Sequence, residues 1–178
     1  FLLVTPAPYV FMLGIITSMI FGFPLWISML ASLSFSIVFL IRGGLNADVR
    51  VNVFEFIIMF LGFGIIIPFC FTQLGSFDYL TFNLPSNHLN LTGGNSLSYI
   101  LVWFFIGAWA VVDPAFHQRC YSAKSEIIAV RGIFVSLLFW FVFDAMTTLT
   151  GLYAFASIRN IEDPVMAYPL LAQNILPS

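Results

Sequence analysis

Five long apolar stretches, separated by shorter polar ones, run along the chain. A helix that crosses a membrane needs about 20 mostly apolar residues, and each stretch has roughly that length. Within each stretch the apolar residues are continuous rather than alternating, which argues against the strands of a membrane barrel. The pattern therefore predicts an all-α, polytopic membrane protein with five transmembrane helices. These helices are expected at residues 1–21, 24–41, 53–71, 97–116 and 132–156.

The basic residues of the polar stretches predict how these helices are oriented. Lysine and arginine concentrate in cytoplasmic loops. If five helices alternate in direction, five of the six basic residues fall on one side and only Arg159 falls on the other. We therefore expect the loop 72–96 and the tail 157–178 to lie outside the cell. The five inner basic residues are Arg42, Arg50, Arg119, Lys124 and Arg131.

Short signals in the polar stretches predict turns and one further helix. Gly43 and Gly44 follow an apolar run and predict a helix end with a turn. In the tail, Asp163 and Pro164 are typical of the first residues of a helix. This outside helix is expected to carry its apolar residues on one side, namely Leu170, Leu171 and Ile175.

Small residues recur at every fourth position on the first two predicted helices. Such spacing lets helix backbones approach closely, so we interpret it as packing rather than as ligand binding. The link between the two helices, residues 22–24, is a tight turn, which predicts an antiparallel hairpin. The repeated residues are Gly14, Ser18 and Gly22 on the first helix and Ser28, Ser32 and Ser36 on the second.

The composition of the 178-residue chain excludes several other classes of protein. Hydrophobic residues make up 61% of it and charged residues only 8%, whereas a soluble domain carries about 25% charged residues. One water-soluble core could not hide so much apolar surface, and disordered chains are rich in charge. Six basic against eight acidic residues provide no basic face for nucleic acid. The motifs of common hydrolases and metal sites are absent, so we expect no enzyme, no cofactor and no metal site within this chain.

Asp144 is the ionisable residue expected near the middle of a transmembrane helix. On insertion scales a central aspartate costs about 2.5–3.5 kcal/mol. Helical spacing places Trp140, Thr147, Thr148 and Gly151 on or beside its face. A face of this kind suits a protein interior or a water-filled pathway. The alternative is a protonated carboxyl group that hydrogen-bonds to a neighbouring helix and only holds the helices together.

A second polar stripe is expected on the fourth helix. Trp109, Asp113 and His117 are spaced by four residues, and Pro114 directly follows the aspartate. Proline removes a backbone donor and disfavours helical geometry at the residue before it. The segment is a candidate for a broken helix, of the kind that exposes backbone groups to ions and substrates in transporters. The length of the apolar run favours the alternative, in which Asp113 and Pro114 mark the inner end of the helix.

Three ordered motifs resemble the sodium:solute symporter family. Residues 118–125, QRCYSAKS, are similar to its Q-R-x-x-x-A-K-(S/D) loop after the sixth core helix. Residues 41–47, ahead of Asn52 and Glu55, resemble the family's aromatic-x-x-x-GG-(L/F)-x-A turn and the T-D-x-x-Q start of its fifth core helix. Residues 163–177 are similar to its outside segment before the eighth core helix. The loop motif is carried by Gln118, Arg119 and Lys124.

The resemblance implies a five-plus-five inverted repeat in which sodium drives solute uptake by alternating access. Residues 1–178 would be a single membrane-embedded fragment that spans core helices three to seven. Sodium would be the coupling ion, but its main site lies on core helices one and eight and therefore outside this fragment.

The resemblance also implies roles for single residues. Trp109 falls where sugar-carrying members place a gating aromatic residue. Trp140 falls where they place a lysine that contacts the substrate, which argues against a sugar. Asn52 replaces the family's aspartate and Glu55 its glutamine. Glu55 could therefore offer a carboxylate one turn deeper, at the inner end of the helix.

Together these features predict a fragment of a sodium-coupled symporter, a multi-pass protein of the cell membrane. Its expected partners are membrane lipid, the sodium ion, a small solute and the remaining transmembrane helices of the same protein. One alternative is a structural membrane subunit whose polar stripes only hold helices together. The other is an intramembrane enzyme, which would need a second catalytic group near an aspartate. Four residues are candidates for the substrate pathway or gate: Trp109, Asp113, Trp140 and Asp144.

Overall fold

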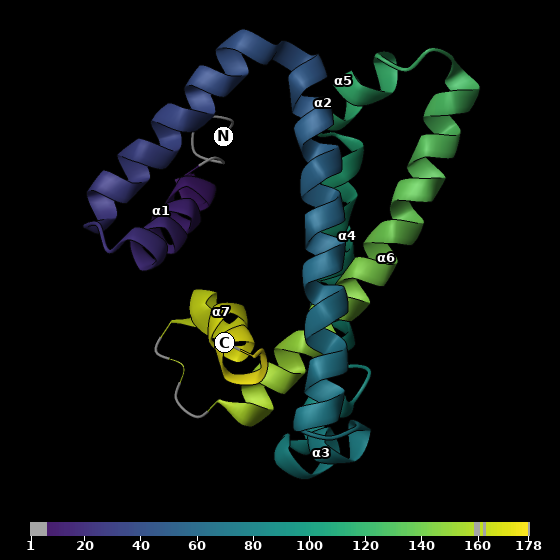
Figure 1. Cartoon of the computed structure of the whole chain (residues 1–178). Coiled ribbons are helices and arrows are strands. Elements are labelled where there is room, and N and C mark those ends of the chain that lie inside the picture. Colours follow the sequence, from purple (N-terminus) through teal and green to yellow (C-terminus); the bar gives the residue numbers. More distant parts are fainter. Residues whose placement is uncertain (1–6, 159–160, 162, 178) are drawn as a thin grey trace. The chain divides into compact units, whose positions relative to one another are not determined.

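A computed structural model of the chain describes residues 7–158, 161 and 163–177, and this part consists of helices and the turns between them (Figure 1). The all-α prediction is therefore confirmed for the described residues. The α-helices are α1 (Ala7–Phe21), α2 (Leu25–Gln73), α3 (Phe77–Asn83), α4 (Leu97–Gly107), α5 (Pro114–Tyr121), α6 (Glu126–Ser157) and α7 (Ala167–Ile175). Three short 3-10 helices are η1 (Ser86–Leu89), η2 (Ala108–Val111) and η3 (Pro164–Met166).

Two of the described helical segments are long and apolar enough to cross a membrane, namely Gly43–Gln73 and Glu126–Ser157. The segments Ala7–Phe21 and Leu25–Val38 meet the same criterion only as a pair, bent by 112°. Two spans, or three with the bent pair, are thus supported in the described part of the chain. The membrane character of the protein agrees with the prediction, whereas the count of five transmembrane helices is not confirmed.

Helix boundaries differ most from the prediction where polar residues continue a helix. A loop was expected at residues 42–52, but α2 runs through this region with a single non-helical residue, Gly44 (φ 53°, ψ −158°). The predicted turn is thus reduced to one kink, at a positive φ that glycine adopts without a steric penalty. Likewise α6 begins at Glu126 rather than at residue 132, with the Ser125 hydroxyl capping the Ile128 amide at 3.4 Å. Hydropathy detects only the apolar part of a helix, because polar turns beyond the membrane can stay helical.

By its internal contacts the chain divides into two compact units, Phe1–Met59 and Phe60–Ser178. In the first unit α1 and the start of α2 are joined by a tight turn as predicted, but they are bent by 112° rather than antiparallel. The Thr17 and Ser32 hydroxyls lie 3.0 Å apart between the two helices. Gly14 is buried against Met29, since a Cβ atom at this glycine would overlap the methionine side chain. These contacts agree with the interpretation of the small residues as a packing surface. The interpretation of residues 1–178 as a single domain stays a prediction.

The close approach at Gly14 gives a testable expectation. Replacing Gly14 by leucine should lower the free energy of unfolding by about 1–3 kcal/mol, because extra atoms must displace Met29 and its backbone. Gly62→Leu is the matched control, since nothing lies within 4 Å of the position of its added Cβ atom. The measurement is thermal unfolding of both variants in detergent. Equal shifts in the two midpoints would show that the contact between α1 and α2 contributes nothing.

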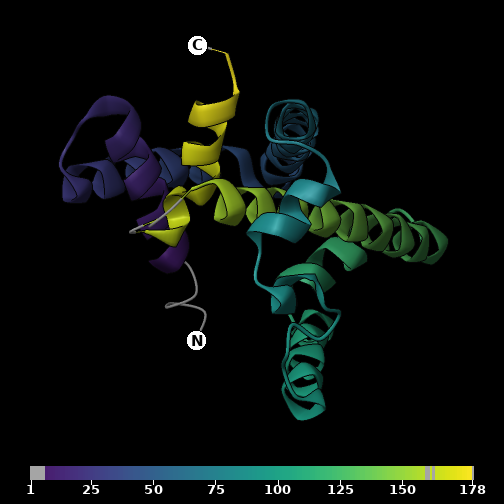
Figure 2. The same cartoon turned by 90° about the horizontal axis from the view of Figure 1, so that it is seen from below.

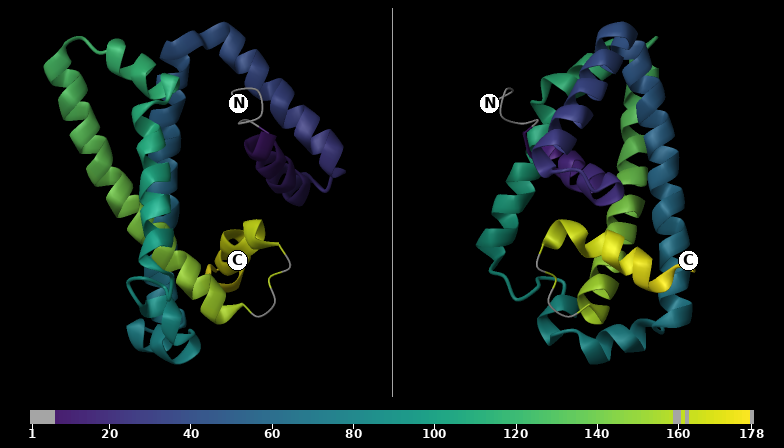
Figure 3. Two further views of the ribbon diagram at one scale, coloured as in Figure 1. Left: turned by 180° about the vertical axis from the view of Figure 1, so that it is seen from behind. Right: turned by 60° about the vertical axis from the view of Figure 1, so that its left-hand side comes forward.

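The second unit has its core where α3 and α7 pack against the C-terminal half of α6 and the end of α2. Figure 2 shows α3 beside α6, and Figure 3 shows α7 lying against the same helix. Tyr153 is fully buried there, and its hydroxyl donates to the Gly75 carbonyl oxygen at 2.8 Å. The Tyr79 hydroxyl donates to the Ala156 carbonyl oxygen at 3.4 Å. The buried apolar residues of this core are Cys70, Leu80, Leu84, Tyr153, Ala154, Leu171 and Ile175.

The helix predicted in the tail is present. The Asp163 carboxylate accepts a hydrogen bond from the Val165 amide at 3.0 Å and caps η3, which leads directly into α7. Leu171 and Ile175 are buried in the core, and Leu170 is half-buried. The apolar side of α7 therefore holds the tail against α6.

Candidate functional site

The polar face predicted on α6 is formed as expected. Asp144 lies near the middle of the helix, which is one of the two candidate membrane spans. Its side chain is exposed, and within the described chain the carboxylate has no hydrogen-bond or ion-pair partner. Trp140, one turn earlier, is 68% exposed. The structure thus leaves an indole ring and a carboxylate uncovered on one face of a helix with the length and hydropathy of a membrane span.

A different face of α6 is fastened to α2 by aromatic rings. Phe60 of α2 lies with its ring centroid 5.7 Å from Phe139 and 5.4 Å from Phe143. Phe63 makes an edge contact with Phe143 at 5.3 Å. Successive residues of an α-helix are turned by about 100°, so Asp144 points well away from this aromatic contact. The packing therefore determines the direction of the polar face.

Tyr168 of α7 lies beside the polar face, a neighbour that helical spacing did not predict. Its hydroxyl donates to the Thr147 carbonyl oxygen at 3.3 Å, and its ring makes an edge contact with Phe63 at 5.3 Å. A Cβ atom added to Gly151 would lie 3.7 Å from the same hydroxyl oxygen, so the glycine leaves room for the tyrosine. The contact joins α7 to α6 one turn after Asp144. It depends on tertiary packing, which helical spacing does not reveal.

The two threonines of the face differ in their hydrogen bonding. The Thr147 hydroxyl donates to the Asp144 carbonyl oxygen at 3.1 Å and is thus occupied by its own helix. Thr148 is exposed, and within the described residues its hydroxyl has no such bond. The Thr147 oxygen keeps its lone pairs and can still accept a hydrogen bond. The groups available on this face are therefore the Asp144 carboxylate, the Trp140 indole and the two threonine hydroxyls, of which Thr147 can act only as an acceptor.

The second predicted stripe does not lie on one continuous helix. α4 ends at Gly107, the short helix η2 follows, and Asp113 is extended (φ −69°, ψ 119°). The Asp113 carboxylate accepts a hydrogen bond from the Ala115 amide at 3.0 Å and caps α5. His117 Nε2 lies 2.6 Å from the Val111 carbonyl oxygen and so bridges the interruption. The helix is thus interrupted after Gly107, as in the less favoured of the two interpretations, and Asp113 caps the helix that follows the interruption.

The other residues predicted near this break belong to α5 and the turn that leads to α6. Trp109 lies in η2 and is 49% exposed. Gln118 and Arg119 are in α5, where the arginine occupies the last turn, and Lys124 lies in the following turn. A cation in the last turn of a helix interacts favourably with the helix dipole. Within the described residues, no hydrogen bond or ring contact joins Asp113 to Trp140 or Asp144, so the two stripes remain separate.

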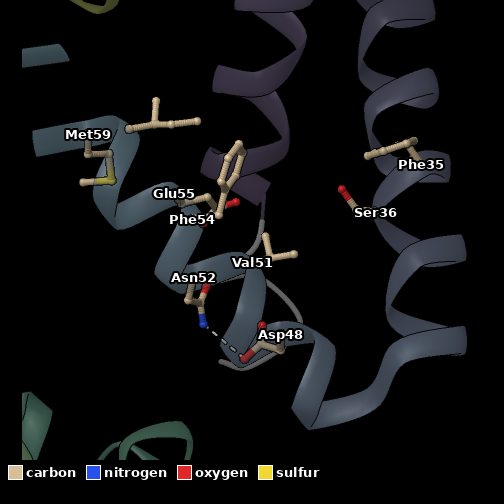
Figure 4. Close-up of a pocket in the computed structure, with 9 residues that line it drawn as sticks. Phe35, Ser36, Asp48, Val51, Asn52, Phe54, Glu55 and Met59 are labelled. Carbon is tan, nitrogen blue, oxygen red and sulfur yellow. Dashed lines mark hydrogen bonds between the residues drawn. The ribbon is translucent and has the colours of Figure 1, made fainter. Parts of the chain in front are cut away.

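Asn52 and Glu55 line a cavity of about 650 Å³ in the first unit (Figure 4). The cavity lies inside the bend of α2, because its walls come from the helix on both sides of Gly44. The Asn52 side-chain amide donates to an Asp48 carboxylate oxygen at 3.2 Å. The lining consists of Phe35, Ser36, Asp48, Val51, Asn52, Phe54, Glu55, Ile58 and Met59.

The cavity therefore combines two carboxylates, an amide and a hydroxyl with aromatic and aliphatic walls. Arg42 and Arg50 are the nearest basic residues in the sequence that could form an ion pair with Glu55. The Arg42 side chain is outside the described residues, and no pair with Arg50 is present. Among the described residues no three histidine, cysteine, aspartate or glutamate side chains are grouped to hold a metal ion. The predicted residues thus form two distinct groups, the α6 polar face and the α2 cavity, with the α4–α5 break as a third feature.

Comparison with known proteins gives one match. The model of the family described as the sodium:solute symporter family matches residues 9–178, which includes the α2 cavity, the break and the α6 face. No curated protein and no solved structure matches the chain.

Proposed function

Because the chain belongs to the sodium:solute symporter family, we propose that it forms part of a secondary active transporter in which sodium entry drives the uptake of a small solute by alternating access. The match over residues 9–178 is the observation that carries this proposal. The helical fold and the apolar candidate spans support a place in the membrane. We further propose that the chain is a fragment, equivalent to core helices three to seven of a five-plus-five inverted repeat, in a multi-pass protein of the cell membrane.

The α6 polar face is the proposed solute-facing surface of this fragment. A carboxylate in a membrane span costs several kcal/mol unless it serves a protein partner, an ion or a solute. Symport needs groups at the depth where the solute is held, and Asp144 lies near the middle of its span. Trp109 is proposed as the gating residue, since its half-exposed indole sits in the short helix between α4 and α5.

The α2 cavity is the proposed route by which sodium leaves toward the cytoplasm. Its carboxylate, amide and hydroxyl oxygens are of the kind that hard cations bind. The positive-inside rule places this part of α2 near the inner surface, beside Arg42 and Arg50. The main sodium site would lie on helices outside this fragment, so the cavity would act after the ion has left that site.

Loss of the Glu55 charge is expected to weaken sodium binding at the inner surface. In the full-length protein, Glu55→Gln should raise the half-saturating sodium concentration, measured from the cytoplasmic side, about fivefold. This corresponds to about 1 kcal/mol for one partly screened carboxylate. The matched control is Asp78→Asn, which removes an exposed carboxylate in α3, far from the cavity along the chain. If the half-saturating sodium concentration is unchanged in Glu55→Gln, the cavity is not part of the sodium route.

Solute-evoked currents in proteoliposomes that contain the full-length protein test the proposed function itself. A symporter that moves net charge gives currents that require sodium on the solute side, and an electroneutral one gives sodium-dependent uptake of radiolabelled solute. A structural subunit, the alternative, gives no current with any solute.

A further inference from the structure

The α6 polar face carries one strong charge and no second ionic group. Helical geometry places Trp140 and Asp144 one turn apart on this face, and both side chains are exposed. Within the described residues neither side chain has a hydrogen bond, an ion pair or a ring contact. The nearest polar neighbour in the next turn is Thr148. A ligand on this face would therefore meet a negative charge, an exposed indole ring and two threonine hydroxyls, of which Thr147 can only accept.

These groups favour a positively charged organic ligand. A cation is attracted by a carboxylate and, over the face of tryptophan, by about 0.5–1 kcal/mol in exposed sites and about 2 kcal/mol when desolvated. Inside a membrane protein the Coulomb attraction to Asp144 is stronger than in water, because the surroundings are less polar. An ammonium group with small alkyl substituents can interact with the Asp144 carboxylate and the Trp140 indole at once, since the two residues are neighbours on the helix.

Other solute classes fit the same groups less well. An anion would be repelled by Asp144, which has no described cation beside it. A sugar needs many hydrogen-bond partners for its hydroxyl groups, yet beside the carboxylate the described residues of this face offer only two threonine hydroxyls, and that of Thr147 can only accept. A bare sodium ion prefers several oxygen ligands, and the described residues of this face offer only the carboxylate and the two threonine oxygens. An indole ring adds nothing to ion coordination by oxygen.

We propose that the transported solute is a small organic cation, an amine or a quaternary ammonium compound, and that Trp140 and Asp144 bind its positively charged group. This inference rests on the proposed symport function and names the substrate class of the same site. Tyr168 lies one turn beyond the aspartate, bonded to the Thr147 carbonyl oxygen, and bounds the site on the α7 side.

The experiment measures sodium-dependent currents in proteoliposomes that contain the full-length protein, with three sets of probes. The cations are tetramethylammonium and ethanolamine, the neutral solutes are glucose and myo-inositol, and the anions are acetate and lactate. We expect currents with the cations. Asp144→Asn should raise the half-saturating cation concentration at least tenfold, and Asp144→Glu should recover most of the affinity. Trp140→Ala should raise it about fivefold, whereas Trp140→Phe should retain more of the affinity because it keeps an aromatic face.

Two controls separate binding from folding. Glu126→Gln removes a carboxylate from the first turn of the same helix and should leave the cation constant unchanged. Thermal unfolding of each variant in detergent should show a native midpoint, so that a changed constant reports binding. If Asp144→Asn does not fold, Asp144→Glu and Trp140→Phe still test the inference. The quantity measured in each variant is then the ratio of the half-saturating concentrations of tetramethylammonium and ethanolamine.

The outcomes distinguish the inference from the function on which it rests. Sodium-dependent currents with neutral or anionic probes alone would overturn the inference and leave symport intact. Cation currents with an unchanged constant in Asp144→Asn would also overturn it, because the charge would then lie outside the binding site. Absence of sodium-dependent current with every probe would overturn the inference, whereas the proposed function is contradicted only if no solute at all shows sodium-dependent uptake.

Discussion

Tyr153→Ala is expected to lower the free energy of unfolding by about 3–5 kcal/mol, the largest stability effect that the structure predicts. The Tyr153 side chain is 0% exposed and belongs to the core that joins α2, α3, α6 and α7. Its ring contacts Phe71 at 5.7 Å and stacks on Tyr79 at 6.3 Å. Truncation would leave a cavity between these rings and would remove the hydrogen bond to Gly75.

Two comparison variants separate these contributions. Tyr153→Phe keeps the ring and loses only the hydroxyl, so we expect the free energy of unfolding to fall by about 1 kcal/mol. The loss is larger if no water replaces the hydroxyl at the Gly75 carbonyl oxygen. Phe82→Ala removes an aromatic ring of α3 that is 88% exposed and should cost much less. Unfolding by a denaturing detergent in mixed micelles measures all three variants. Similar losses for Tyr153→Ala and Phe82→Ala would show that the buried core does not hold this unit together.

Trp109→Ala is expected to lower sodium-dependent solute currents at least tenfold, the largest functional effect after loss of the binding charge. A tenfold change corresponds to about 1.4 kcal/mol. The indole sits in η2, between two helices whose junction is interrupted at Val112 and Asp113. A bulky ring at such a break can close a pathway in one state and leave it in another, and alanine cannot replace it.

The matched control for this experiment is Trp103→Ala. Trp103 lies in α4, six residues earlier in the chain, and at 57% it is about as exposed as Trp109. The account assigns it no part in the pathway, so its currents should stay within about twofold of the wild-type protein. A gating role would be contradicted by equal losses in the two variants, which would indicate a general effect of removing an indole from this region.

The apolar pattern predicted the helical class and the membrane character, but it did not predict where helices end. α2 continues through Asp48, Arg50 and Asn52, where the sequence indicated a loop. These side chains are polar, yet none of them breaks a helix, and Gly44 alone departs from helical geometry. Conversely, α4 ends at Gly107, well inside an apolar run. Hydropathy reports which solvent a segment prefers, whereas helix ends depend on backbone conformation and capping.

The candidate site was partly predictable for the same physical reason. Helical spacing alone placed Trp140 and Asp144 on one face, and the structure agrees because α6 is unbroken there. The contact of Tyr168 with Thr147 was not predictable, since it forms when α7 folds back against α6. Asp113 looked equally promising in the sequence, but its carboxylate caps α5. Spacing identifies neighbours within one helix and says nothing about partners from another.

The most direct test of sodium-coupled transport is accumulation of a solute against its own gradient. Proteoliposomes that contain the full-length protein would be loaded with potassium and placed in a solution of radiolabelled tetramethylammonium with either sodium or potassium outside. We expect the internal concentration to rise above the external one only with sodium outside, and to fall back when a sodium ionophore is added. Equal uptake with the two external ions would contradict sodium-coupled transport.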